Sequence, residues 1–188
     1  MRLEGMRAFL SEDAISGHLA YYRRERCKYS ILEKSIPEIR GKSLRELYKM
    51  PHSGDLGDEI LSRANFLKSH ELYFSSFCER RRVCCEIKKY YSSEAAFLYE
   101  ISERALRMQG GFLYILRDRR GRPFAVSGED LRYGRDFAPA LALDMAEHAY
   151  FLDYRFNKER YISAALAALD LNEIFSDENL RLYLDTPI

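Results

Sequence analysis

Apolar and aromatic residues recur at helical spacing along two long stretches in the first half of the chain. The first stretch follows Ser11, whose hydroxyl suits an N-cap, and runs to about Ser35, before Pro37. The second begins at Leu56 and continues past Phe77. Two long helices that follow one another in a chain can pack side by side in opposite directions, and we expect these two to form an antiparallel helical hairpin.

The period changes in the second half, where short apolar runs separated by turns indicate strands. We predict a helix from Ser93 to about Met108, strands at Phe112–Leu116, Phe124–Val126 and Ala138–Leu143, and a closing helix at Arg160–Leu169. The third strand ends on Asp144, and residues 172–188 show no pattern that predicts an element. A charged linker at residues 79–85 separates an N-terminal helical hairpin domain, residues 1–83, from a C-terminal α/β domain, residues 87–188.

Composition limits the classes of partner. The chain has 188 residues, 47% of them hydrophobic, and its 30 basic side chains against 29 acidic ones give a net charge of +1. That balance argues against a nucleic-acid partner, so the arginines at 80–82 and 117–122 are interpreted as a solvated linker and an exposed hairpin tip. No run approaches the ~20 apolar residues of a membrane span. The first residues show no signal-peptide pattern, so we expect a protein that does not enter a membrane.

The four cysteines show no C-x-x-C spacing. They are Cys27, Cys78, Cys84 and Cys85. We interpret them as reduced, partly buried thiols, which indicates a cytoplasmic protein; a redox pair or a thiolate metal site is the alternative.

The stretch Asp144–Phe156 carries the candidate chemistry. Asp144 and His148 are four residues apart, so one helical turn or a tight bend brings both side chains to one point. A carboxylate with an imidazole suits iron, manganese or zinc, but two ligands alone do not hold a metal tightly. On spacing alone, a purely structural pair remains the main alternative.

The full string D-M-A-E-H-A-Y-F-L-D-Y resembles the D-x-W-E-H-A-Y-Y-L-D-Y signature of the iron/manganese superoxide dismutases. It departs from that signature at Ala146 and Phe151. Two segments upstream are also similar to the family: L-S-E-D-A-I-S-G-H, which ends on His18, and S-H-E-L-Y-F, which contains His70. The resemblance covers about residues 10–170.

The resemblance implies an α+β fold, in which the helical hairpin precedes a three-stranded antiparallel sheet flanked by helices. It also implies that His18, His70, Asp144 and His148 hold one iron or manganese ion, a ligand set that suits these metals. Of the four histidines in the chain, only His52 falls outside this set, and we expect it to be exposed. The implied activity is the conversion of superoxide to dioxygen and hydrogen peroxide.

Several positions around the implied site depart from the family pattern. Tyr22 and Arg26 stand where the family has a gateway histidine and a gateway tyrosine. Glu129 stands at the solvent-binding glutamine of manganese members, and Phe66 at that of iron members. Tyr73 and Phe74 take an aromatic and a tryptophan position, and the chain has no tryptophan, so we expect a larger or wetter pocket.

The resemblance also implies a homodimer. Glu147, which in the family reaches the metal histidine of the partner subunit, is retained. Tyr22 and Phe151 replace the two partners of a histidine–tyrosine bridge between subunits, so no buried polar group need be orphaned there. The sequence thus predicts a cytoplasmic, metal-dependent superoxide dismutase. The alternative is a metal-binding or structural protein with the same fold and weak or no dismutase activity.

Overall fold

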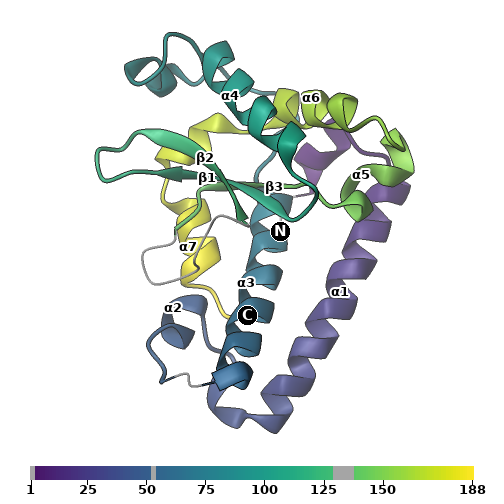
Figure 1. Ribbon diagram of the computed structural model, residues 1–188, viewed down its shortest axis with the longest axis vertical. Coiled ribbons are helices and arrows are strands. Elements are labelled where there is room, and N and C mark those ends of the chain that lie inside the picture. The colour runs from purple at the N-terminus through teal and green to yellow at the C-terminus, as the bar shows by residue number, and fades with distance from the viewer. Residues whose placement is uncertain (1–2, 52–53, 129–137) are drawn as a thin grey trace.

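The computed structural model describes residues 3–51, 54–128 and 138–188, and Figure 1 shows their arrangement. The long elements of the first half are α1 (Glu12–Ser35) and α3 (Gly54–Ser75), with the short helices η1 (Glu4–Ala8), η2 (Pro37–Ile39) and α2 (Leu44–Leu47) around them. The second half contains η3 (Cys85–Lys89), α4 (Glu94–Arg107), β1 (Phe112–Arg117), β2 (Pro123–Ser127), β3 (Leu141–Asp144), α5 (Glu147–Tyr154), α6 (Lys158–Ala168), η5 (Leu171–Phe175) and α7 (Glu178–Leu184).

The two long helices form the predicted antiparallel hairpin (Figure 1). α1 begins where the Ser11 hydroxyl accepts the Ala14 N–H at 3.1 Å, as the sequence predicted. α3 ends at Ser75, whereas the sequence predicted a helix that continues past Phe77. Phe77 forms an isolated bridge with Leu169, in extended backbone that a continuing helix would not allow.

The three strands form an antiparallel sheet in the order β2–β1–β3. The central strand β1 pairs on both sides, so that Tyr114 lies opposite Val126 of β2 and Ala142 of β3. β3 begins at Leu141, not at the predicted Ala138, because pairing with β1 extends only from Asp144 to Leu141. Helices lie above and below this sheet in Figure 1. The predicted α+β fold is confirmed.

The segment after α6 holds elements that the sequence pattern did not predict, η5 and α7. Their residues are fixed by distant partners. The fully buried Tyr183 donates its hydroxyl to Asn65 Oδ1 at 3.0 Å, and the Asn179 amide donates to the Ala140 carbonyl at 3.0 Å. α7 therefore packs onto the helical hairpin, and one hydrophobic core runs through both halves of the described chain. The division at residues 83–87 remains a prediction.

All four cysteines are free thiols in the structure. Within the described residues, every helix is too short or too polar to cross a membrane. His52, which we expected to be exposed, lies outside the described residues.

Candidate metal centre

Four side chains from four separate elements converge between the hairpin and the sheet. His18 comes from the first half of α1, His70 from the second half of α3, Asp144 from the end of β3 and His148 from the first turn of α5. One nitrogen or oxygen atom from each lies within 4.8 Å of the others. The side chain of His148 is 28% exposed, whereas those of the other three are buried. The structure therefore brings together the four residues that the resemblance implied.

Asp144 lies at the centre of this cluster. One carboxylate oxygen, Oδ1, accepts the Ala146 N–H at 2.9 Å, and this bond aims Oδ2 at the histidines. The Nε2 atoms of His148, His18 and His70 lie 3.0, 3.2 and 3.5 Å from Oδ2. The Asp144 carbonyl accepts the Tyr161 hydroxyl at 2.7 Å, which anchors the end of the strand. A single carboxylate oxygen thus faces three imidazoles.

The backbone of α3 sets the tautomer of His70. Its Nδ1 lies 2.9 Å from the Phe66 carbonyl oxygen, which can only accept, so Nδ1 carries the hydrogen. The lone pair is then on Nε2, which faces Asp144. Burial lowers the pKa of His70 to about 4, although the Asp144 charge opposes the shift, and the ring is neutral near pH 7. A neutral imidazole with its outer nitrogen hydrogen-bonded is the form in which histidine binds metals.

The protonation of Asp144 suits the same role. Burial alone would raise the pKa of its carboxyl, but the nearby imidazoles of His148 and His18 hold that pKa well below its ordinary value. Asp144 is therefore an ionised carboxylate that faces the neutral His70 nitrogen. Two electron-pair acceptors in this position repel one another unless a proton or a cation lies between them.

Unsatisfied atoms give an independent test of the fit to a metal. Of the buried side-chain polar atoms in the described chain that lack a hydrogen-bond partner, all but the Tyr29 hydroxyl belong to this cluster. They are His18 Nδ1 and Nε2, His70 Nε2 and Asp144 Oδ2. Buried polar atoms are rarely left unsatisfied, so their concentration at one point favours a bound cation. Three imidazoles and one carboxylate suit iron or manganese.

Aromatic rings enclose the buried side of the cluster. The ring centroids of Tyr73 and Phe74 both lie 5.1 Å from that of His18, and both side chains are fully buried. The Tyr73 hydroxyl is 3.3 Å from the Tyr161 hydroxyl. These rings keep water away from His18 and hold it in place through packing.

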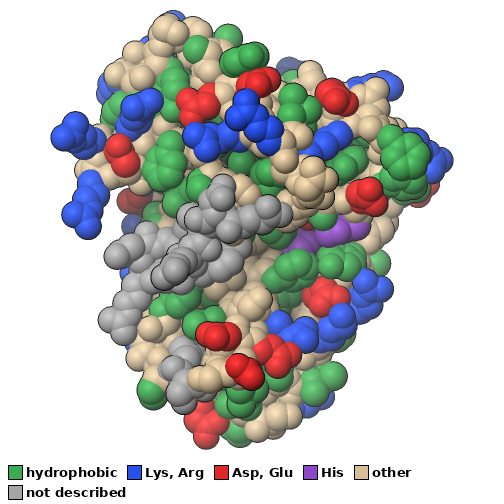
Figure 2. Space-filling view, in the orientation of Figure 1, with side chains coloured by type: hydrophobic (Ala, Val, Ile, Leu, Met, Phe, Trp, Pro, Cys, Tyr) green, Lys and Arg blue, Asp and Glu red, His purple; other side chains and the backbone are tan. Residues whose placement is uncertain are grey.

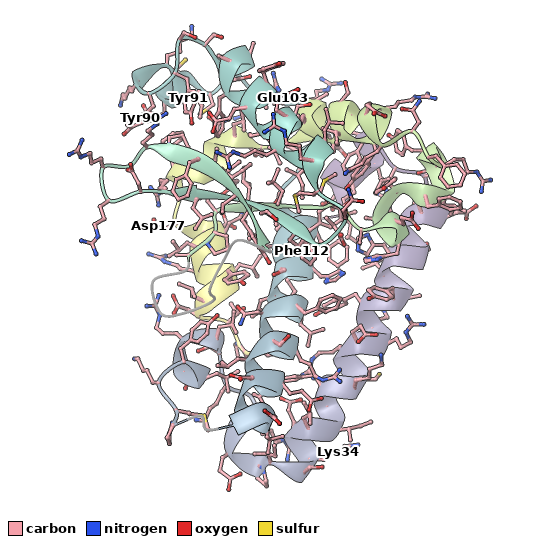
Figure 3. The ribbon with its side chains drawn as sticks, viewed as in Figure 1. Lys34, Tyr90, Tyr91, Glu103, Phe112 and Asp177 are labelled. Carbon is pink, nitrogen blue, oxygen red and sulfur yellow. The ribbon has the colours of Figure 1, made fainter. Side chains whose placement is uncertain are left out.

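A cavity of about 370 Å³ reaches the other side of the cluster. Its lining in the described residues consists of Tyr21, Phe66, Gly111, Phe112, Gly128, Asp144, Ala146 and His148. Phe112, labelled in Figure 3 at the start of β1, has its ring centroid 4.9 Å from that of His70. Histidine atoms, in purple, can be seen in Figure 2. Ala146, which stands at a tryptophan position of the family pattern, lines this cavity.

The two gateway positions inferred from the sequence lie apart from the cavity. Tyr22 has its ring 6.1 Å from that of His70, but its hydroxyl donates to Glu71 at 2.7 Å. The Arg26 guanidinium donates to Glu33 and to the Ile188 carbonyl, so the structure does not bring Arg26 to the cluster. Glu129 lies outside the described residues.

The residues expected at a subunit interface lie on α5. Glu147 is exposed at the first residue of the helix, and Phe151 is half-buried. The Phe151 ring centroid is 5.4 Å from that of Phe156, which is 84% exposed. Both positions therefore lie at or near the surface beside His148.

Sequence reasoning missed Tyr21. Its ring centroid lies 4.2 Å from that of His148, closer than those of Tyr22 or Phe74 lie to any histidine of the cluster. One signal was available: Tyr21 is three residues after His18, and residues at that spacing share a helix face. The family pattern directed attention to positions four and eight residues after His18.

Comparisons with known proteins agree with this geometry. The chain is 24% identical to "Superoxide dismutase [Fe]" of Legionella pneumophila over 190 aligned residues, which cover 95% of this chain and 94% of that protein. It is 22% identical to "Superoxide dismutase [Fe] 2, chloroplastic" of Oryza sativa over 174 residues, 86% of this chain and 68% of that protein. A family profile described as "Iron/manganese superoxide dismutases, C-terminal domain" matches residues 79–177, more than half of the chain. On this match the chain belongs to the iron/manganese superoxide dismutase family.

Proposed function

We propose that this protein is a superoxide dismutase that holds one iron or manganese ion through His18, His70, Asp144 and His148. The observation that carries the proposal is the convergence of three imidazole Nε2 atoms on Asp144 Oδ2, at 3.0–3.5 Å, among atoms that otherwise lack partners. The metal, when bound, would supply the one-electron chemistry by which one superoxide is oxidised to dioxygen and the next, with two protons, is reduced to hydrogen peroxide.

The side chains of this protein would support that chemistry in distinct ways. Asp144 contributes a negative charge that offsets part of the charge of the cation. The Phe66 carbonyl holds His70 in the tautomer that presents Nε2. Tyr73 and Phe74 exclude water from the buried side, and the cavity at Asp144 and His148 has room for a small anion.

Assembly into a homodimer belongs to the same proposal. Glu147 and the partly exposed His148 lie on one short helix, and the exposed apolar side chains Leu152 (52% exposed) and Phe156 (84% exposed) follow within eight residues. Apolar side chains beside a polar functional site fit an interface between copies of the chain. The four free thiols support the cytoplasmic location predicted from the sequence.

A second candidate is a metal-binding protein that keeps the fold but has weak or no dismutase activity. It is favoured by the bonding of Tyr22 and Arg26, whose polar groups contact Glu71 and Glu33 and do not face the cavity. An incoming anion then meets neither a gateway hydroxyl nor a gateway charge from these positions.

One experiment separates the two candidates. The metal content of purified protein is measured by elemental analysis, and superoxide consumption is followed by pulse radiolysis in the same sample. We expect about one iron or manganese ion per chain and a rate that scales with occupancy. Full occupancy without superoxide consumption would select the second candidate, and a chain that takes up neither metal would reject both.

A further inference from the structure

Two cavities meet at the side chains of Tyr21 and Phe66. The inner cavity, described above, touches Asp144 and His148. An outer cavity of about 320 Å³ lies in the groove between α1 and α3, where Glu25, Glu59 and Arg63 line it. Tyr21 and Phe66 line both cavities. The two rings therefore form the boundary between them.

The rings also cover the histidines. The Tyr21 centroid lies 4.2 Å from that of His148 and 5.9 Å from that of His70, and the Phe66 centroid lies 4.4 Å from that of His70. The centroids of Tyr21 and Phe66 are 6.1 Å apart, in an edge-to-face arrangement. The His70 side chain is 0% exposed although the outer cavity lies just beyond Phe66. Its burial on this side depends on the two rings.

Ring packing holds Tyr21 in place. Within the described residues its hydroxyl makes no hydrogen bond, and besides the ring contacts its face meets the Arg24 guanidinium, 5.0 Å from the centroid. Tyr22, the next residue, is different, because its hydroxyl is bonded to Glu71. The contribution of Tyr21 is thus steric: it fills the space between the groove and the histidines.

We propose that Tyr21, with Phe66 behind it, is a partition that closes the α1–α3 side of the centre, confines access to the inner cavity and so selects small ligands over large ones. This inference rests on the proposed metal site. Tyr21 is then a specificity-determining residue, because its ring limits the size of the molecules that reach His70 and His148 and the direction from which they approach.

The test uses the full chain loaded with iron(II). Two chelators of different size, one neutral and one anionic, then remove the metal. Release of iron is followed by absorbance with 2,2′-bipyridine, which is small, and with bathophenanthroline disulfonate, which is bulky. The variants are Tyr21→Ala, Tyr21→Phe, which keeps the ring, and Tyr99→Ala, a control at a tyrosine on α4 that is 67% exposed. We expect release to the bulky chelator to become roughly tenfold faster in Tyr21→Ala. Tyr21→Phe and Tyr99→Ala should stay within about twofold of the unmodified protein.

The comparison of the two chelators distinguishes a partition from a weakened site. An opened groove accelerates release to the bulky chelator more than to the small one. Equal acceleration with both would show that Tyr21→Ala merely loosens the ligands, and would overturn the proposal, as would unchanged release to both.

A second readout does not depend on metal. Diethylpyrocarbonate modification of the metal-free chain is mapped by mass spectrometry, with the fold checked by circular dichroism. His70 should be protected in the protein without substitutions and in Tyr21→Phe, and should react roughly tenfold faster in Tyr21→Ala. A chain that takes up no metal would contradict the proposed function. The rate at which diethylpyrocarbonate modifies His70 would still show whether Tyr21 closes this side of the centre.

Discussion

The ammonium of Lys68 is fully buried and donates to Glu71 Oε2 at 2.7 Å, while the other carboxylate oxygen of Glu71 accepts the Tyr22 hydroxyl. Lys68 also donates to Thr186 Oγ1 and to the Pro187 carbonyl, at 2.5 and 3.1 Å. The cation is thereby fully satisfied, and it ties α3, which carries His70, to α1 and to residues 186–187.

We expect Lys68→Met to destabilise the protein by about 3 kcal/mol, because it leaves the Glu71 carboxylate without its cation. The double variant Lys68→Met, Glu71→Gln should recover part of that loss. Free energies of unfolding from urea titration measure both effects. Lys28→Met is the matched control, because Lys28 makes an ion pair of the same 2.7 Å length with Glu25 but is 50% exposed. That control should cost at most about 1 kcal/mol; an equal cost for the two lysines would contradict the role of burial.

Loss of single ligands should weaken metal binding. We expect His70→Ala and His148→Ala each to lower the affinity for iron or manganese at least about tenfold. Competition with a calibrated chelator measures this, and His52→Ala, which removes the remaining histidine of the chain, serves as the control. Undiminished occupancy in His148→Ala would show that the ion lies elsewhere.

The buried neutral His70 predicts a pH dependence of stability in the metal-free protein. Its pKa is about 4 in the folded protein against 6.5 for the free side chain, so between these values the unfolded chain binds more protons. Stability should therefore be complete above pH 6.5 and decline as the pH falls toward 4, by up to about 3 kcal/mol. Urea titrations at several pH values measure the slope. His70→Gln should flatten it, and an unchanged slope in that variant would assign the dependence to another group.

Glu129 remains the subject of a sequence-based prediction. If a carboxylate stands where the family has its solvent-binding glutamine, it repels an incoming anion and favours the oxidised metal. We expect dismutase activity well below the ceiling of about 10⁹ M⁻¹s⁻¹, and higher activity in Glu129→Gln at equal metal loading. Pulse radiolysis on metal-quantified samples gives both rates. Lower activity in the variant would reverse the assignment.

The proposed dimer can be tested at its exposed apolar side chains. Phe156→Asp should convert the dimer to a monomer at micromolar concentration, because a charge replaces an apolar contact at the interface. Sedimentation velocity reports the state. Tyr99→Asp, an equally drastic change at another exposed ring, should leave the oligomeric state unchanged. If the protein without substitutions sediments as a monomer, the dimer is excluded.

Local signals account for what the sequence predicted. Ser11 and Ser93 cap α1 and α4 with their own hydroxyls, and such bonds depend on neighbouring residues alone. The four clustered side chains were identified because the motifs around them resemble those of a known family. α7 was not predicted, since its seven residues are stabilised mainly by Tyr183 and other tertiary contacts.

The position of Tyr21 could not be predicted for a related reason. Spacing places it on the same helix face as His18, but its contact with His148 depends on how α5 docks against α1. The burial of Lys68 likewise depends on residues 186–187, more than a hundred positions away. Non-local packing decides both, and a helical period does not encode it.

The four proposed ligands come from four separate elements, which has a consequence for how the protein would take up a metal. In an unfolded chain only Asp144 and His148 are near one another, and such a pair holds a metal weakly. His18 and His70 join them after the hairpin has closed and docked on the sheet. Under the proposed function we therefore expect tight metal uptake to be a late event, which stabilises the completed native state over every partly assembled one. The metal content of a sample would then indicate how much of the chain has folded correctly.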